Sequence, residues 1–209
     1  MDSTRVDSLL QFVGLGKVRL TPDYRIAMQQ PGMRLDFNAI AKGYSVDRLG
    51  VMLEDKGAAD YLIEVGGELR TLGINQLKEQ PWVVGIDDPQ VLEGRKIKQI
   101  ITLRDRSMAS SGNYRKFRVD SISGKKYVHT IDPRTGYTKD SKILAVSVLA
   151  ETCMRADGFA TAFMAMELEA SKRILETDNS LEGYIIYLDE SGATSEYMTP
   201  GFKAVLKED

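Results

Sequence analysis

The sequence predicts an α+β fold, because stretches with helical character cluster between runs of short strands and do not alternate with them one for one. Segment 143–149 is apolar enough to be a central strand, and two strands at 184–188 and 194–198 read as a closing hairpin. The chain has 209 residues, of which 43% are hydrophobic. That is enough for one sizeable core, or for two small subdomains that share one. No repeat, low-complexity tract or linker divides the chain, so we expect a single domain over residues 1–209.

Apolar spacing predicts helices at residues 6–13, 38–54, 152–166 and 167–176. The first ends at a glycine, the third is rich in small residues, and the fourth is charged. We expect Asn38 to cap the second helix through its side chain. The apolar residues expected to face the core are Ile40, Tyr44, Leu49, Val51 and Leu53 in the second helix, and Leu168, Ile174 and Leu175 in the fourth.

Short β-rich runs bounded by turn residues predict the remaining strands. The small residues of segment 108–114 indicate a turn that connects two of them. The predicted strands, besides those named above, are 17–20, 24–28, 61–65, 68–72, 82–86, 98–103, 114–119 and 126–130.

Composition narrows the classes of function. A net charge of −2 and a pI near 5.6 give no basic surface for nucleic acid, so we expect no nucleic-acid partner. Cys153 is the only cysteine, which excludes an internal disulfide, and His129 is the only histidine, so together they exclude a Cys/His zinc site. A metal here should therefore be a hard cation held by oxygen atoms. No apolar run has the length of a membrane-spanning helix and the first residues do not resemble a signal peptide, so we expect this form to be soluble.

Segment 36–47 is the first that could carry chemistry. Alanines and Gly43 line the first turns of its helix, which would let a ligand approach the backbone closely. Unpaired N–H groups at a helix start suit phosphate, and Lys42 would supply positive charge. The ordinary alternative is a capped helix with Lys42 and Asp47 in solvent.

Two glycine- and serine-rich segments follow. Gly66 and Gly67 interrupt a strand pair, which a tight turn or bulge explains, or else they form a backbone floor under a ring or phosphate with Glu68 bonding a polar ligand group. The hydroxyl groups around Ser111 suit phosphate, although the same residues would also make a simple strand connection.

Segment 129–136 gathers His129, Asp132 and Arg134 in a turn that contains proline. His129 is the one side chain with an ordinary pKa near neutrality, which suits a general base, yet a lone histidine is more often structural. Asp132 would orient it, and Arg134 would pair with phosphate or with a neighbouring carboxylate. The residues leave these alternatives open.

Asp157 and Thr161 lie four residues apart in the predicted helix 152–166 and therefore share a face. A carboxylate and a hydroxyl one turn apart can reach one hard cation, but two ligands are too few, so other oxygen atoms must complete the shell. The alternative is that Thr161 bonds back to the carbonyl of Asp157.

Six stretches of the chain occur in the same order in the ApbE family of FAD:protein FMN transferases, which this sequence resembles. Each alone is weak, and the ordered set spans nearly the whole chain. The stretches are 35–47, 65–68, 85–89, 110–114, 129–136 and 156–162.

The resemblance implies a compact α+β fold with mixed or antiparallel sheets packed by helices, and an FAD molecule in a cleft beside Mg²⁺. It implies Mg²⁺-dependent transfer of FMN from FAD to a threonine or serine hydroxyl of an acceptor flavoprotein, with release of AMP. It places the metal ligands at Asp157, Thr161 and the carbonyl of Ala39. The residues it places at the dinucleotide are Lys42, Gly67, Glu68, Ser111, His129, Asp132 and Arg134, with His129 and Asp157 as the catalytic pair.

The resemblance also implies a partner and a location. The acceptor would carry a motif of the type Asp-Gly-x-Ser/Thr-Gly/Ala-Ala-Thr, and the protein would work in the bacterial periplasm or at the outer face of the cytoplasmic membrane. Typical members have a further N-terminal portion with early strands, part of the flavin pocket and often a lipoprotein signal, the one membrane anchor we expect. Here the resemblance begins near the helix before Lys17, so we expect weak affinity for the flavin ring. Two other hypotheses are a Mg²⁺-dependent FAD pyrophosphatase and a non-catalytic FAD-binding protein.

Overall fold

The computed structural model describes residues 2–91, 94, 96–112, 117–119, 126–128, 131–137 and 142–207. The chain forms two compact units. One comprises Met1–Asp36 with Phe117–Asp140, and the other comprises Phe37–Lys116 with Ser141–Asp209. The two are described separately below as the first unit and the second unit.

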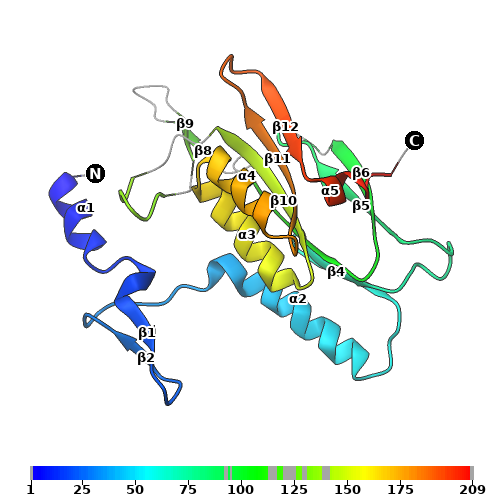
Figure 1. Ribbon diagram of the computed structural model, residues 1–209, viewed down its shortest axis with the longest axis horizontal. Coiled ribbons are helices and arrows are strands. Elements are labelled where there is room, and N and C mark those ends of the chain that lie inside the picture. Colours follow the sequence, from blue (N-terminus) through cyan, green and yellow to red (C-terminus); the bar gives the residue numbers. More distant parts are fainter. Residues whose placement is uncertain are drawn as a thin grey trace. The chain divides into compact units, whose positions relative to one another are not determined.

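The second unit is built on an antiparallel sheet of six strands in the order β12-β11-β10-β7-β4-β3 (Figure 1). Its most apolar strand, β10, has strand neighbours on both sides and is largely buried, as expected for segment 143–149. The strands are β3 (Tyr61–Val65), β4 (Glu68–Leu72), β7 (Ser107–Gly112), β10 (Ile143–Ala150), β11 (Glu182–Leu188) and β12 (Thr194–Met198).

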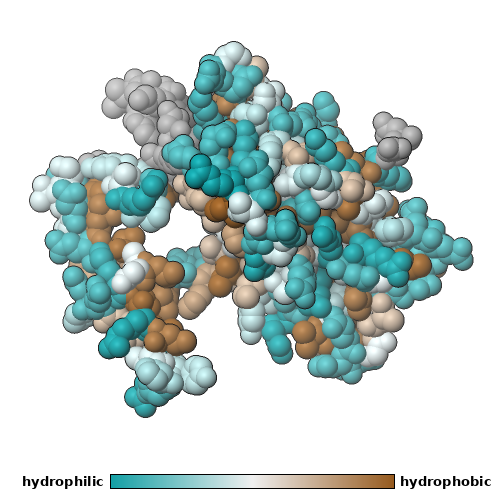
Figure 2. Space-filling model, in the orientation of Figure 1, coloured by the Kyte–Doolittle hydropathy of each residue, from teal (hydrophilic) through white to brown (hydrophobic). Residues whose placement is uncertain are grey.

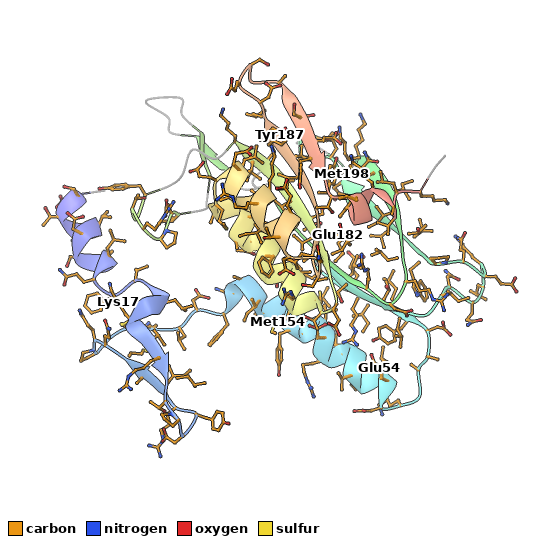
Figure 3. All side chains as sticks on the ribbon, in the orientation of Figure 1. Lys17, Glu54, Met154, Glu182, Tyr187 and Met198 are labelled. Atoms are coloured by element: carbon orange, nitrogen blue, oxygen red, sulfur yellow. The ribbon has the colours of Figure 1, made fainter. Side chains whose placement is uncertain are left out.

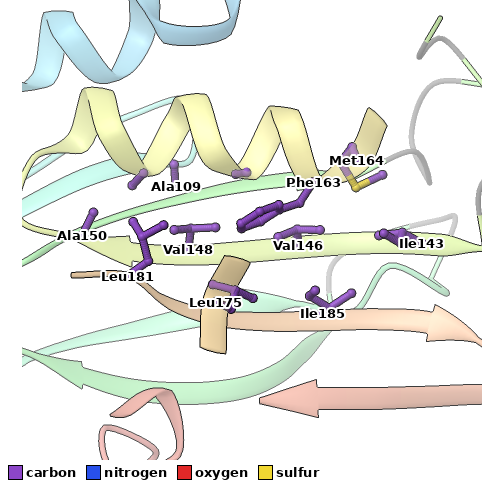
Figure 4. Packing of buried hydrophobic residues seen from close by; sticks show 12 residues of the cluster. Ala109, Ile143, Val146, Val148, Ala150, Phe163, Met164, Leu175, Leu181 and Ile185 are labelled. Atoms are coloured by element: carbon purple, nitrogen blue, oxygen red, sulfur yellow. The ribbon is translucent and has the colours of Figure 1, made fainter. Parts of the chain in front are cut away.

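One face of this sheet is covered by helix α3 (Cys153–Ala165), which packs on β7 and β10. Four of its six buried residues are small, and the other two are Phe163 and Met164, so much of the helix lies close to the strands. In Figure 4, Phe163 lies between Val148 and Val146 of β10, and Met164 lies toward Ile143. Helix α4 (Leu168–Thr177) adds Leu175 to this core, and α2 (Asn38–Glu54) packs against α3 and β4.

The other face carries a second apolar cluster that joins the sheet to the hairpin of β5 (Trp82–Asp87) and β6 (Ile97–Leu103). The short helix α5 (Pro200–Lys203) adds the buried ring of Phe202. Because side chains alternate along a strand, Leu69 of β4 joins this cluster while its neighbour Glu68 points to the helical face.

The first unit contains α1 (Ser3–Leu10), a 3₁₀ turn (Leu15–Lys17) and two hairpins. Val6 of α1 is buried against the loop 131–137, where a side chain on Gly136 would come within 2.5 Å of it. The hairpins pair β1 (Val18–Leu20) with β2 (Ile26–Met28), and β8 (Phe117–Val119) with β9 (Lys126–Val128).

The α+β class is confirmed, and most predicted helices and strands are present within a few residues. Segment 108–114 is not a turn, because its described part lies in β7 between two other strands. Asn38 is not the N-cap of α2; Phe37 holds that position without a side-chain hydrogen bond. The residues that α2 buries are Gly43, Val46 and Gly50, and none of the five larger apolar residues that we expected.

None of the described helices combines the length and hydropathy that a membrane crossing needs. The visible face of the second unit is mostly hydrophilic, with separate apolar patches (Figure 2). Exposed apolar side chains on α2, among them Tyr44 and Met52, account for part of the apolar surface.

Candidate functional site

Helices α2 and α3 are joined by two sets of long-range hydrogen bonds that run in opposite directions, three bonds in all. In the first, Asp47 of α2 accepts the backbone N–H groups of Cys153 at 2.9 Å and Met154 at 2.8 Å. These N–H groups begin α3 and have no partner within the helix, so Asp47 acts as a cap from outside it. From the sequence, one reading of Asp47 was a side chain in solvent. Its role as a cap depends on Cys153, which lies 106 residues further along the chain, so no pattern near Asp47 indicates it.

In the second, Asp157 of α3 accepts the backbone N–H of Gly43 of α2 at 2.9 Å through Oδ2. The Asp157 side chain is buried, with 3% of the residue exposed. In an α-helix the N–H of residue 43 faces the carbonyl of residue 39, so this bond brings Asp157 beside the first turn of α2 and the Ala39 carbonyl. The role of Asp157 and of the Ala39 carbonyl as metal ligands stays a prediction.

Arg70 of β4 forms ion pairs with two carboxylates of α2. Its guanidinium lies 3.6 Å from Asp47 Oδ1 and 2.8 Å from Glu54 Oε1. Figure 3 labels Glu54 at the end of α2 and Met154 at the start of α3. The contacts of Arg70 attach the C-terminal half of α2 to the sheet. They also hold the Asp47 side chain beside the first residues of α3.

Lys42 and Glu68 form an ion pair on the same face, with Lys42 Nζ 2.5 Å from Glu68 Oε1. Only 1% of Glu68 is exposed, whereas about half of the Lys42 side chain reaches solvent. Burial raises the pKa of Glu68, Lys42 opposes that shift, and the nearby Asp157 carboxylate raises the pKa further. Glu68 Oε2 is buried and has no hydrogen-bond partner among the described residues.

Cys153 lies among these charges without being a nucleophile. Burial raises the pKa of its thiol, and the carboxylates of Asp47, Glu68 and Asp157 raise it further. A thiol held protonated in this way is unreactive.

A pocket of about 540 Å³ lies on the opposite face of the sheet, and Gly66, Gly67, Ser110, Ser111 and Ser147 are among its lining residues. Gly66 and Gly67 have φ of 63° and 100° and form a two-residue hairpin turn, one of the two structures expected for them. The Ser110 and Ser147 hydroxyls lie 2.8 Å apart and bond to each other.

This glycine turn is where the pocket comes near the ion pair. A Cβ at Gly66 would lie 3.8 Å from Glu68 Oε2 and 3.9 Å from Lys42 Cδ. Three of the predicted site side chains, Lys42, Glu68 and Asp157, are thus brought together in the second unit, with Gly67 beside them. Thr161 lies one turn after Asp157 on α3 and is partly buried.

Asp132 and Arg134 lie in the first unit and form a compact turn. The Asp132 carboxylate accepts the Arg134 backbone N–H at 2.8 Å and two guanidinium N–H groups at 3.2 and 3.1 Å. Arg134 thus has the neighbouring carboxylate of Asp132 as a partner, and its pairing with phosphate stays a prediction. His129 lies outside the described residues, so its predicted role stays a prediction.

No group of three or more histidine, cysteine, aspartate or glutamate side chains in the described part of the chain is arranged to hold a metal ion. A cation at Asp157 would therefore need hydroxyl and carbonyl oxygen atoms as well. Thr161 and Ala39 offer such atoms, and these are ligands that Mg²⁺ accepts.

The chain is similar to proteins of known family. The profile of the ApbE family matches residues 1–185. Two curated proteins named FAD:protein FMN transferase are similar, one from Haemophilus influenzae (33% identity, 87% of this chain and 52% of that protein) and one from Vibrio cholerae (35%, 85% and 52%). The crystal structure of the Pseudomonas stutzeri flavinyl transferase ApbE in its apo form aligns with a TM-score of 0.82 at 27% identity, over 98% of this chain and 61% of that one.

The flavin transferase ApbE from Vibrio cholerae aligns with a TM-score of 0.83 at 29% identity, over 99% of this chain and 63% of that one. The chain spans about half the length of the curated relatives it matches. The family profile nevertheless covers most of the 209 residues. This chain therefore belongs to the ApbE family.

Proposed function

We propose that this protein binds FAD with Mg²⁺ and transfers the FMN half to a serine or threonine hydroxyl of an acceptor flavoprotein, with release of AMP. The observation that carries the proposal is the convergence of Lys42, Glu68 and Asp157 at the crossing of α2 and α3. Relatives that bear the name FAD:protein FMN transferase support it.

Lys42 is the residue we assign to the pyrophosphate. Its side chain is half exposed, so the ammonium group can reach a ligand while Glu68 holds it in place. A lysine binds phosphate as a compact point charge, and the buried Glu68 carboxylate keeps that charge at one position. Gly67 and Ser111 would lie along the dinucleotide, where small residues permit close approach.

Asp157, Thr161 and the Ala39 carbonyl would hold Mg²⁺. Gly43 occupies Asp157 Oδ2, so the cation would use the other carboxylate oxygen. When bound, Mg²⁺ supplies charge neutralisation at the pyrophosphate. The buried carboxylates of Asp157 and Glu68 favour a cation there, because they repel one another.

The transfer step forms a bond between the acceptor hydroxyl oxygen and the phosphorus of the FMN phosphoryl group. The bond from that phosphorus to the bridging oxygen breaks, and AMP leaves with the oxygen. The hydroxyl proton must go to a base, and we propose His129 for this role because its ordinary pKa is near neutrality. Asp132 and Arg134 would position the loop that carries it.

The acceptor we propose is a flavoprotein with the motif Asp-Gly-x-Ser/Thr-Gly/Ala-Ala-Thr. The site of action we propose is the bacterial periplasm or the outer face of the cytoplasmic membrane, with a lipoprotein anchor as the means of attachment. The resemblance to the family is what supports both proposals.

The test incubates the purified chain with FAD, Mg²⁺ and an acceptor flavoprotein domain that carries this motif. Covalent flavin on the acceptor is measured by mass spectrometry, and AMP by chromatography. Transfer predicts equal amounts of both. Free FMN and AMP without modified acceptor would identify a pyrophosphatase, and FAD binding without AMP would identify a non-catalytic binding protein; either result contradicts the proposal.

A further inference from the structure

Helices α2 and α3 hold each other through two polar contacts that lie one helical turn apart. Gly43 of α2 donates its N–H to Asp157 of α3. Four residues further along α2, Asp47 accepts the N–H groups of Cys153 and Met154. The spacing on α3 is the same, because Cys153 and Asp157 are also four residues apart, and residues at this spacing share a face of a helix. Each helix is thus held at two points, and we call this pair of contacts the clamp.

The start of α3 has two caps, of which one is local and one belongs to the clamp. Thr152, the residue before the helix, accepts the Arg155 N–H at 3.3 Å. Asp47 accepts the N–H groups of the two first residues of the helix and ties them to α2. Loss of either cap leaves N–H groups of the first turn without that partner. Loss of Asp47 also releases α3 from α2, which loss of Thr152 does not.

The Asp47 carboxylate is committed to the clamp. Its side chain is 14% exposed, and each of its two oxygen atoms accepts one N–H group of α3. Arg70 of β4 lies 3.6 Å from Asp47 Oδ1 and donates to the Asp47 carbonyl at 3.5 Å. Because both carboxylate oxygens already bond to α3, Asp47 acts on the position of that helix and not directly on a cation.

The proposed cation site depends on this crossing, since its ligands come from both helices. The Ala39 carbonyl belongs to α2, whereas the Asp157 carboxylate and the Thr161 hydroxyl belong to α3. A hard cation needs its oxygen ligands at defined distances, so a displacement of α3 along or away from α2 separates one ligand from the other two. The helices cannot come closer, because even a Cβ at Gly43 would collide with the Cys153 carbonyl. The clamp keeps them from moving apart.

We propose that Asp47 is a positioning residue of this site, which holds α3 against α2 so that oxygen atoms of both helices are in place before a divalent cation binds. The inference rests on the proposed function, because that function supplies the cation. Ligands that are already ordered bind more tightly than ligands that the cation must order. Loss of Asp47 should therefore lower cation affinity about tenfold although no ligand is removed, as for residues that orient metal ligands.

Hydrogen exchange of the metal-free chain, followed by NMR, tests the clamp without a cation. The reporter is the Gly43 amide, because Asp157 and the start of α3 cover it. Asp47→Asn has almost the same volume and keeps one oxygen acceptor, and Thr152→Ala, which removes the local cap, is its control. We expect the Gly43 amide to exchange faster in Asp47→Asn and at the unsubstituted rate in Thr152→Ala. Equal rates in the two variants would overturn the inference.

Binding of Mn²⁺, followed by electron paramagnetic resonance of the free ion, tests the site itself. Mn²⁺ takes the same carboxylate and carbonyl ligands as Mg²⁺. We expect the unsubstituted chain to bind one Mn²⁺ that Mg²⁺ displaces, and Asp157→Asn to lose it. Asp47→Asn should bind Mn²⁺ about tenfold more weakly, and Thr152→Ala should bind it as the unsubstituted chain does. Glu54→Gln, also expected to keep its affinity, changes the charge as Asp47→Asn does, but Glu54 contacts Arg70 and Tyr61 of the sheet.

A cap that only stabilises the fold would give a different pattern. Asp47→Asn and Thr152→Ala would then both lower Tm while their Mn²⁺ affinities stay equal, and this result would overturn the inference. Absence of Mn²⁺ binding by the unsubstituted chain, or binding that Asp157→Asn leaves unchanged, would overturn it too. Arg70→Lys decides if Asp47→Asn does not fold. It keeps Asp47 but loses the planar guanidinium beside it, so Mn²⁺ affinity should fall about threefold, and full affinity would overturn the inference.

The proposed function and the positioning inference fail separately. Neither exchange of the Gly43 amide nor Mn²⁺ binding requires turnover. Absence of FMN transfer by the unsubstituted chain contradicts the function, and both measurements still decide the role of Asp47. FMN transfer by the unsubstituted chain, together with full Mn²⁺ affinity in Asp47→Asn, overturns the positioning inference alone.

Discussion

Gly43 lies where α2 and α3 approach most closely, and replacing it with alanine tests whether that contact shapes the site. A Cβ at Gly43 would lie 2.4 Å from the carbonyl oxygen of Cys153 and 2.7 Å from Met154 Cα. Both are backbone atoms of α3, so they can move away only if the helix moves. A shift of α3 would also stretch the hydrogen bond from Gly43 to Asp157.

The expected change in the free energy of unfolding of Gly43→Ala is the difference of two effects. Alanine favours a helix over glycine by about 1 kcal/mol, and overpacking a close contact costs about 1–3 kcal/mol. Because backbone receives the new methyl group, we place the cost at the upper end of that range. The net destabilisation is then about 2 kcal/mol, which lowers Tm by roughly 4–8 °C in a chain of this size.

Gly50→Ala is the matched control. It lies in the same helix and gains the same helix propensity, but its Cβ would meet the Tyr61 hydroxyl at 2.8 Å and the Arg70 side chain at 3.1 Å. The Tyr61 hydroxyl is the end of a side chain, and Arg70 Cδ and Nε need to give way by only a few tenths of an ångström, so we expect Tm to change by less than about 2 °C.

Thermal unfolding by circular dichroism gives the stability, and AMP release from FAD with Mg²⁺ gives the activity. We expect Gly43→Ala to lose both, and Gly50→Ala to keep both. If Gly43→Ala unfolds at the same temperature as Gly50→Ala and releases AMP at the full rate, the close helix contact does not set the geometry of the site.

Three further variants test single side chains. Asp157→Asn keeps an acceptor for Gly43 N–H but is a poorer ligand for a hard cation, so Mg²⁺-dependent AMP release should fall by about 10²-fold or more with little change in Tm; full activity would remove Asp157 from the metal site. His129→Ala should lower FMN transfer by about 10²–10⁴-fold and leave FAD affinity nearly intact; an equal loss of affinity at normal turnover would show that it only holds substrate. Glu68 has a pKa raised above its ordinary 4.5, so its contribution to stability is present below that pH and is lost as pH rises through the raised value. Glu68→Gln should therefore gain stability relative to the parent as pH rises above about 4.5, measured by urea unfolding, and a constant difference across pH would contradict this.

The sequence predicts the elements whose apolar pattern is strong and local. β10 is an example, because seven of its eight residues are apolar and a run of this length favours a buried strand. β7 was missed for the opposite reason: its sequence, Ser-Met-Ala-Ser-Ser-Gly, has turn composition. Its strand state comes from pairing with β4 and β10 and from Ala109 packing beneath α3, which are contacts no local window contains.

Helix α2 shows the same limit for the core. Sequence periodicity favours large apolar residues as the buried face, but this helix buries Gly43, Val46 and Gly50. At Gly43 the backbone of α3 comes so close that any side chain would collide with it. A hydrophobicity pattern alone does not identify a helix face whose residues are small because another helix packs closely against it.

The two aspartates at the helix crossing explain why the candidate site could be located only in part. Asp157 inside α3 was conspicuous, since aspartate is a poor residue for a helix interior, whereas Asp47 resembles any exposed helical carboxylate. Yet Asp47 orders the first turn of α3, and Asp157 lies one turn further along the same helix. Asp157 is thereby fixed beside the buried Glu68, which brings two carboxylates together with one lysine. Such an excess of negative charge is unfavourable in a buried place unless a cation offsets it, so the arrangement that costs stability in the bare chain is the one that would favour Mg²⁺.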